Sequence, residues 1–154
     1  MSILGAVIVP HPPLIIPTVG HGREQEVQAT IDAYRTAAKH VAAWNPEVLI
    51  ITSPHQIMYA DYFHISPGQG ATGDMSAFGA SQTKLRVDYD SPLRDEIIRC
   101  GETAGIQVGT LGQQDPYLDH GTFVPLYFLR EAGVDCPILR IGLSGFSPID
   151  LLRK

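Results

Sequence analysis

Cysteine is scarce in this sequence: Cys100 and Cys136 are the only two, and they do not form a CxxC pair. Two such residues provide neither a disulfide framework nor a cysteine-based metal motif, so we expect reduced thiols, as is usual in the cytoplasm. No run of about 18 apolar residues is present, so no transmembrane helix is predicted. No basic segment precedes the apolar residues 3–9, so no signal peptide is predicted, and we expect a cytoplasmic protein.

Basic residues are also few, because 11 Lys and Arg stand against 16 Asp and Glu, and the formal net charge is −5. Nucleic acids and anionic membrane surfaces require a basic face, so we expect neither as a partner. The sequence lacks the GxxxxGK[ST] motif that cradles nucleotide phosphates, and it lacks the GxSxG motif of serine hydrolases. Nucleotide binding and serine-based hydrolysis are therefore unsupported.

The pattern that is present is an alternation of strands and helices in a chain of 154 residues, a length typical of one domain. It predicts a layered α/β/α fold with a central, largely parallel or mixed sheet. The expected strands are residues 3–9, 47–52, 59–65, 84–89, 106–110 and 137–143, and the expected helices are residues 23–44, 92–104 and 122–131.

Three local features carry specific expectations. Residues 3–9 (ILGAVIV) are apolar on both faces, which favours a buried strand. Residues 66–82 are rich in Gly, Ser, Ala and Gln, which favours a long loop. Ser91 precedes Pro92 and is the expected N-cap of the helix that follows.

Three of the six histidines share a position relative to the predicted elements. His11 and His55 each follow a predicted strand, and His120 lies just before a predicted helix. Ligands of open α/β sheets bind beyond the carboxyl ends of the strands, so we expect these three side chains to converge. His21 and His40 are expected to be solvated or packed without a chemical role, and His64 is expected to be a core residue.

Prolines surround the first two of these histidines. Pro10, Pro12 and Pro13 flank His11, and Pro54 directly precedes His55. Proline fixes φ and leaves the chain few alternative conformations, so it stiffens loops that must hold a reactive group in place.

Several kinds of chemistry are open to three converging histidines. Neutral imidazole is a good ligand for iron, zinc and copper. Two histidines with one carboxylate form the site of non-haem Fe(II) oxygenases, and a third histidine nearby can act as a general acid or base. A zinc-dependent hydrolase would use the same histidines. A cysteine nucleophile is a weaker alternative because neither cysteine neighbours a histidine.

Four stretches resemble one known superfamily, and they cover nearly the whole chain in the expected order. The sequences VPHPPL (9–14), TSPH (52–55), MYADYFHISPG (58–68) and LDHGTFVPLYFL (118–129) are similar to the LigB-type class III extradiol ring-cleavage dioxygenases. More narrowly, they resemble the dioxygenase-like domain of the AmmeMemoRadiSam proteins, which are related to Memo.

This resemblance implies a role for each histidine. The histidines of the PHPP and SPH motifs correspond to metal ligands, which are His11 and His55 here. The histidine of the DHG motif corresponds to the catalytic acid or base, which is His120. The implied cofactor is Fe(II), with Zn(II) as the alternative, and the implied reactants are a catecholic aromatic substrate and O2. The resemblance does not identify the residues that bind the substrate.

The sequence departs from the family at its end. The third metal ligand of the family comes late in the chain, beyond SPIDLLRK, so we expect residues 1–154 to be a single LigB-like domain that lacks the family's C-terminal part. Asp115 and Asp119 are the candidate substitutes within the chain. The departure also supports a second hypothesis, a non-catalytic Memo-like binding or adaptor protein that keeps a vestigial metal cleft. A truncated sheet would expose an edge, so we expect a homo-oligomer, specifically a homodimer.

Overall fold

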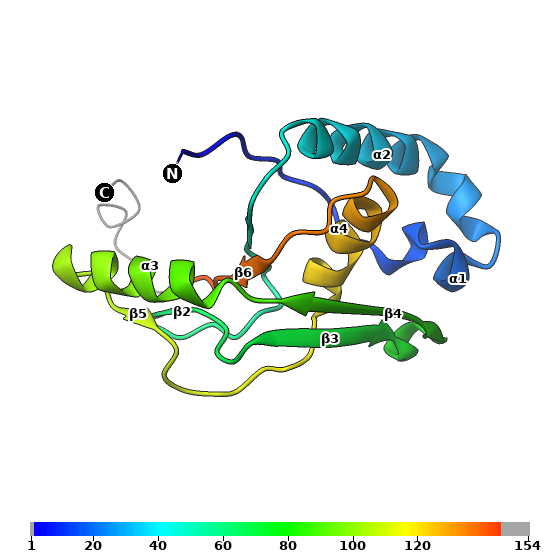
Figure 1. Ribbon diagram of the computed structural model, residues 1–154. Helices are drawn as coiled ribbons and strands as arrows, with labels where there is room; N and C mark the ends of the chain where they lie inside the picture. Colours follow the sequence, from blue (N-terminus) through cyan, green and yellow to red (C-terminus); the bar gives the residue numbers. More distant parts are fainter. Residues whose placement is uncertain (1, 146–154) are drawn as a thin grey trace.

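The computed structural model describes residues 2–145, which form a mixed α/β structure and confirm the predicted fold class (Figure 1). Short 3₁₀ turns at residues 13–15, 23–27 and 76–78 supplement the regular elements. The helices are α1 (Pro17–Gly20), α2 (Gln28–Ala43), α3 (Ser91–Thr103) and α4 (His120–Glu131). The strands are β1 (Leu49–Ile51), β2 (Phe63–His64), β3 (Gly70–Met75), β4 (Ala80–Asp88), β5 (Val108–Gly109) and β6 (Ile138–Arg140). None of the helices within residues 2–145 has both the length and the apolar character needed to span a bilayer.

The strands pair in three ladders that meet around β6. β1 pairs in parallel with β6, β2 pairs in parallel with β5, and β3 pairs antiparallel with β4. Isolated bridges join Tyr89, directly after β4, to Ile138 of β6, and Ile65, directly after β2, to Ile141, directly after β6. All three residues of β6 are buried. The strands therefore form three two-stranded sheets, two parallel and one antiparallel, which these bridges bring together near β6.

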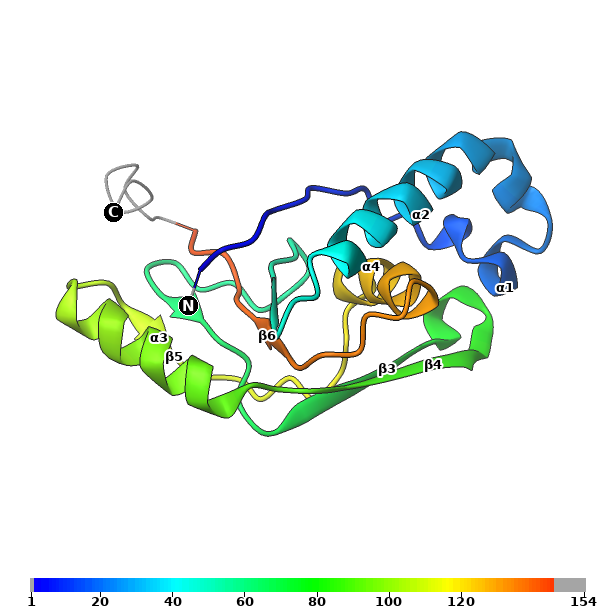
Figure 2. The same ribbon diagram turned by 45° about the horizontal axis from the view of Figure 1, so that its top comes forward.

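Helices α2 and α4 pack side by side, with α4 between α2 and the β3–β4 hairpin (Figures 1 and 2). Tyr34 of α2 stacks on Phe128 of α4, with ring centroids 4.5 Å apart. The first turn of α4 also carries Phe123 and Val124, which are fully buried in the main core. This packing fixes the N-terminus of α4, where His120 lies.

The prediction of a buried strand at residues 3–9 is wrong. The segment has no regular secondary structure and pairs with no strand among residues 2–145, and Ile3 and Ile8 are 93% and 102% exposed. Its apolar, β-branched composition suits a pleated, half-buried surface, but composition does not supply the neighbouring strand that a ladder requires. The segment therefore presents apolar side chains to solvent.

The prediction of a long loop at residues 66–82 is also wrong, because β3 and the start of β4 form a hairpin there. Gly79 turns the chain at φ 81°, a conformation that favours glycine. Gly73 is required by close packing, since a Cβ at this position would lie 2.7 Å from the Cβ of Leu118. The small residues that indicated a loop are therefore requirements of a tightly packed hairpin.

The helix boundaries differ slightly from the prediction. The N-cap of α3 is Asp90, whose carboxylate accepts a hydrogen bond from the Leu93 amide at 2.9 Å, and Ser91 is the first helical residue. Helix α4 begins at His120, two residues earlier than predicted, and Asp119 caps it. This earlier start places His120 on a helix rather than in a loop.

Candidate metal centre

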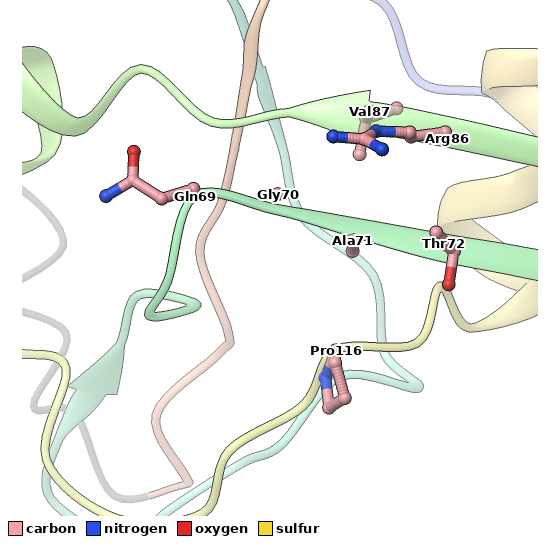
Figure 3. Close-up of a pocket in the computed structure, with 7 residues that line it drawn as sticks. All are labelled: Gln69, Gly70, Ala71, Thr72, Arg86, Val87 and Pro116. Carbon is pink, nitrogen blue, oxygen red and sulfur yellow. The ribbon is translucent and has the colours of Figure 1, made fainter.

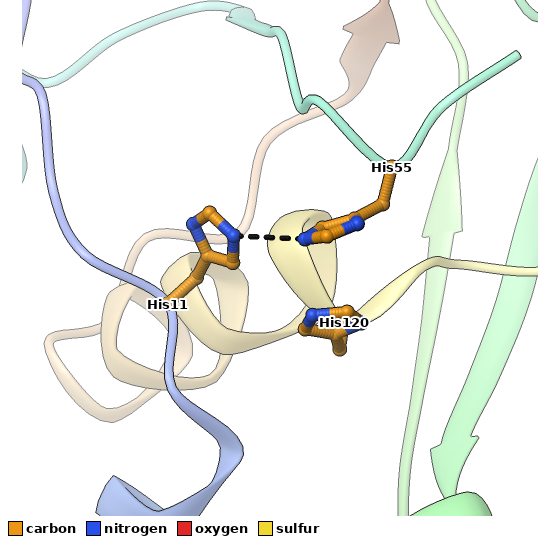
Figure 4. Close-up of side chains that lie close together, drawn as sticks. All are labelled: His11, His55 and His120. Carbon is orange, nitrogen blue, oxygen red and sulfur yellow. Dashed lines mark hydrogen bonds between the residues drawn. The ribbon is translucent and has the colours of Figure 1, made fainter.

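The structure brings His11, His55 and His120 together, as expected from their positions after strands and before a helix (Figure 4). One ligand atom from each residue lies within 4.8 Å of those of the other two. The Nε2 atoms of His11 and His55 are 3.0 Å apart. The ring of His120 lies 4.0 Å from that of His55 and 5.6 Å from that of His11, measured between centroids. His55 is exposed and the other two are half-buried.

This arrangement fits a metal ion. Two imidazole nitrogens that each bind one ion at about 2.1 Å can be at most about 4.2 Å apart. The nitrogens of His11 and His55 satisfy this limit without movement. Imidazole is a preferred ligand of both iron and zinc, so the donor set alone does not choose between them.

The loop that carries His11 is held by α2. The hydroxyl of Tyr34 donates a hydrogen bond to the Pro10 carbonyl at 2.7 Å, one residue before His11. Burial raises the pKa of Tyr34 far above its usual value, so the hydroxyl remains a donor. His11 is thereby fixed by a contact from a distant helix as well as by its neighbouring prolines.

The turn that carries His55 is held by Ser53. The backbone amide of His55 donates to Ser53 Oγ at 3.1 Å, and that hydroxyl in turn donates to Asp119 Oδ1 at 2.6 Å. Ser53 is buried, so these bonds are shielded from water. The Ser-Pro-His motif is therefore tied directly to the residue that precedes His120.

Gly121 allows the first turn of α4 to approach this histidine turn. A Cβ at Gly121 would lie 2.3 Å from Ser53 Oγ and 3.1 Å from His55 Cδ2. Any larger side chain would push α4 away from His55. Sequence reasoning overlooked this residue, although a glycine directly after a candidate site histidine is a signal of close approach.

Asp115 and Asp119, the candidate substitutes for a third ligand, face Arg140 and not the histidines. Arg140 Nη2 donates to Asp119 Oδ2 at 3.0 Å and to Asp115 Oδ2 at 3.1 Å. The metal-ligand group found within residues 2–145 contains the three histidines and neither carboxylate. The interpretation of these aspartates as ligands is therefore corrected: they balance the charge of a buried arginine.

The electrostatics of the site favour a neutral His120. Burial lowers the pKa of His120, the nearby His55 and His11 lower it further, and Asp119 opposes them. The neutral ring is the form that accepts a proton or binds a metal. Burial alone would raise the pKa of Asp119, but hydrogen bonds from Ser53 and Thr122 and the charge of Arg140 outweigh it and lower this pKa.

One aromatic side chain borders the histidines. Phe78, at the tip of the β3–β4 hairpin, packs edge-on against His120 with ring centroids 5.4 Å apart. It is 39% exposed, so part of its ring is available to a ligand at the site. A separate shallow pocket lies further along the hairpin, beside Gln69, Arg86 and Pro116, and none of the histidines lines it (Figure 3).

The remaining histidines lie outside the site. His64 is 3% exposed, which confirms the prediction of a core residue, and burial lowers its pKa. His21 and His40 are exposed. Both cysteines are free thiols in the structure.

Comparison with known proteins agrees with the resemblance seen in the sequence. Residues 5–151 match the model of a family described as the catalytic LigB subunit of aromatic ring-opening dioxygenase. The chain is also similar to Protein CA_C1420 of Clostridium acetobutylicum, with 30% identity over 160 residues, a match that covers 99% of this chain and 34% of that relative. The chain thus spans about a third of the length of the relative. Because the family model matches nearly all of its residues, the chain belongs to the LigB family of aromatic ring-opening dioxygenases.

Proposed function

We propose that this protein is a class III extradiol dioxygenase, which uses non-haem Fe(II) and O2 to cleave a catecholic aromatic ring. The observation that carries the proposal is the convergence of His11, His55 and His120 within 4.8 Å in a chain of the LigB family. Fe(II), when bound, supplies the redox chemistry by which O2 opens the ring.

Each histidine has a distinct role in this proposal. His11 and His55 hold the metal, since their Nε2 atoms already lie 3.0 Å apart. His120 is the general acid and base: its neutral ring takes a proton from a catechol hydroxyl and returns it during ring opening. Phe78 offers an aromatic edge beside His120 against which the substrate ring can pack.

Two observations support alternatives. Three imidazoles also form the ligand set of some catalytic zinc sites, so a zinc-dependent hydrolase is the first alternative. No carboxylate joins the histidines within residues 2–145, which favours a non-catalytic Memo-like adaptor with a vestigial cleft.

Within the same proposal, we assign the protein to the cytoplasm, because a reducing compartment suits its two free thiols.

Anaerobic reconstitution of the protein with Fe(II) distinguishes the dioxygenase from the non-catalytic adaptor. The chain is loaded with Fe(II), mixed with a panel of catechols and exposed to O2, and we expect yellow ring-fission products. His120→Gln should bind the metal as the unaltered chain does and form no product, because the variant lacks the proton-transferring imidazole. Metal analysis of the purified protein distinguishes iron from zinc. A chain that binds iron yet forms no product with any catechol would favour the adaptor.

We expect the protein to self-associate through the exposed apolar residues 3–9. Ile3 and Ile8 are almost fully exposed, and residues 3–9 pair with no strand among the described residues, so a second copy can cover them. We expect light scattering to give twice the mass of one chain. The double substitution Ile3→Lys and Ile8→Lys should give a folded monomer, because neither side chain is buried within the chain. A compact monomer at every concentration of the unaltered chain would refute this prediction.

A further inference from the structure

Asp119 makes more hydrogen bonds than a helix cap requires. Its Oδ1 accepts from the Thr122 amide at 3.0 Å, which is the capping bond, and also from Ser53 Oγ at 2.6 Å. Its Oδ2 accepts from Thr122 Oγ1 at 2.7 Å and from Arg140 Nη2 at 3.0 Å. One carboxylate therefore joins β6, the turn before His55 and the start of α4.

The N-cap of α3 provides a comparison within the same chain. Asp90 accepts from the Leu93 amide at 2.9 Å, and no serine hydroxyl or arginine adds to this contact among the described residues. Helix α3 is one residue longer than α4 and is capped by this simpler arrangement. The additional contacts of Asp119 are thus not needed to start a helix.

These contacts lead to two of the three histidines. Through Ser53, the carboxylate of Asp119 fixes the His55 amide, and His120 is the next residue along the chain. Arg140, which is fully buried, anchors the carboxylate to β6. Movement of Ser53, Asp119 or Arg140 would change the distance between the rings of His55 and His120.

We propose that Ser53, Asp119 and Arg140 are positioning residues that hold His55 and His120 at the separation needed to serve one metal site. This inference rests on the proposed metal site and adds the residues that orient its histidines. Partners that orient metal-site residues from outside typically contribute about 10–100-fold to metal affinity. None of the three residues belongs to the metal-ligand group, so they act on the histidines through hydrogen bonds and the adjoining backbone.

Ser53, Asp119 and Arg140 form a hydrogen-bond network, and two substitutions each remove a different contact of it. Ser53→Ala removes the acceptor of the His55 amide and leaves the cap of α4 intact. Asp119→Asn keeps an oxygen for Ser53 and Thr122 but turns an amide donor toward Arg140. Asp90→Asn is the matched control, because it makes the same change at an N-cap far from the histidines in sequence.

The first measurement needs no metal. Ring protons of His55 and His120 should give a nuclear Overhauser effect in the unaltered chain, since the ring centroids are 4.0 Å apart. We expect Ser53→Ala and Asp119→Asn to weaken or abolish this effect, and Asp90→Asn to preserve it. An unchanged effect in both network variants overturns the proposal, whether or not the chain binds a metal.

The second measurement is a Co²⁺ titration followed by visible absorption, carried out on folded protein below the melting temperature. We expect dissociation constants about 10–100-fold higher for the two network variants and unchanged for Asp90→Asn. The double variant should lose less affinity than the product of the single losses, because both residues act in one network. Equal affinity in all variants overturns the positioning role alone, whereas no Co²⁺ binding by the unaltered chain contradicts the proposed metal site.

Discussion

Replacing His55 with alanine is expected to abolish metal binding and to leave the fold intact. His55 is exposed, and within residues 2–145 its ring contacts the other two site histidines, so alanine leaves no buried cavity. Of the two proposed ligands, whose Nε2 atoms lie 3.0 Å apart, only His11 would remain. His11→Ala should have the same effect for the same reason.

Thermal unfolding with and without metal measures this loss. Metal at 100 times its dissociation constant stabilises the unaltered chain by about 2.7 kcal/mol, since it binds the folded state. We expect the corresponding rise in melting temperature to disappear in His55→Ala and His11→Ala. His40→Ala, which removes an exposed histidine on α2 outside the site, should keep the full rise. Retention of the rise in His55→Ala would exclude His55 as a ligand.

The position of this site could be predicted from local sequence, because the argument needed only the ends of elements. His55 follows β1 and His120 begins α4, and a strand and a helix were expected at both places from the sequence. The prediction for His11 succeeded for a different reason than expected. No strand precedes it among residues 2–10, and its loop is held by the hydroxyl of Tyr34.

The support of the site could not be predicted, because it depends on contacts between distant residues. Arg140 lies in a strand that was recognised, yet no local pattern shows that it is buried or that it meets Asp115 and Asp119. Likewise, the antiparallel pairing of β3 with β4 decided the structure of residues 66–82 against their composition. In both cases tertiary pairing outweighed the local signal.

Arg140→Met is expected to cause the largest loss of stability of any substitution considered. The guanidinium is fully buried, and it donates to Asp115, Asp119, the Tyr117 carbonyl and the Tyr89 hydroxyl. Burial disfavours its charge, yet the contacts with Tyr89 and the two carboxylates outweigh burial and raise the pKa of Arg140. Methionine fills similar space but leaves both carboxylates without their cation. Removal of one partner from a buried ion pair costs about 3–5 kcal/mol.

The denaturation midpoint of Arg140→Met should therefore fall far below that of a matched surface variant. Arg99→Met provides the comparison, because Arg99 pairs with Glu96 on the exposed side of α3, where such a pair contributes about 0–1 kcal/mol. Equal midpoints for the two variants would show that the carboxylates are solvated without Arg140. A large loss that is partly recovered by adding Asp115→Asn would show that the unpaired charge, and not the lost packing, causes the destabilisation. Asp119 would then still connect Ser53 to α4, because its bonds to Ser53 and Thr122 do not involve Arg140.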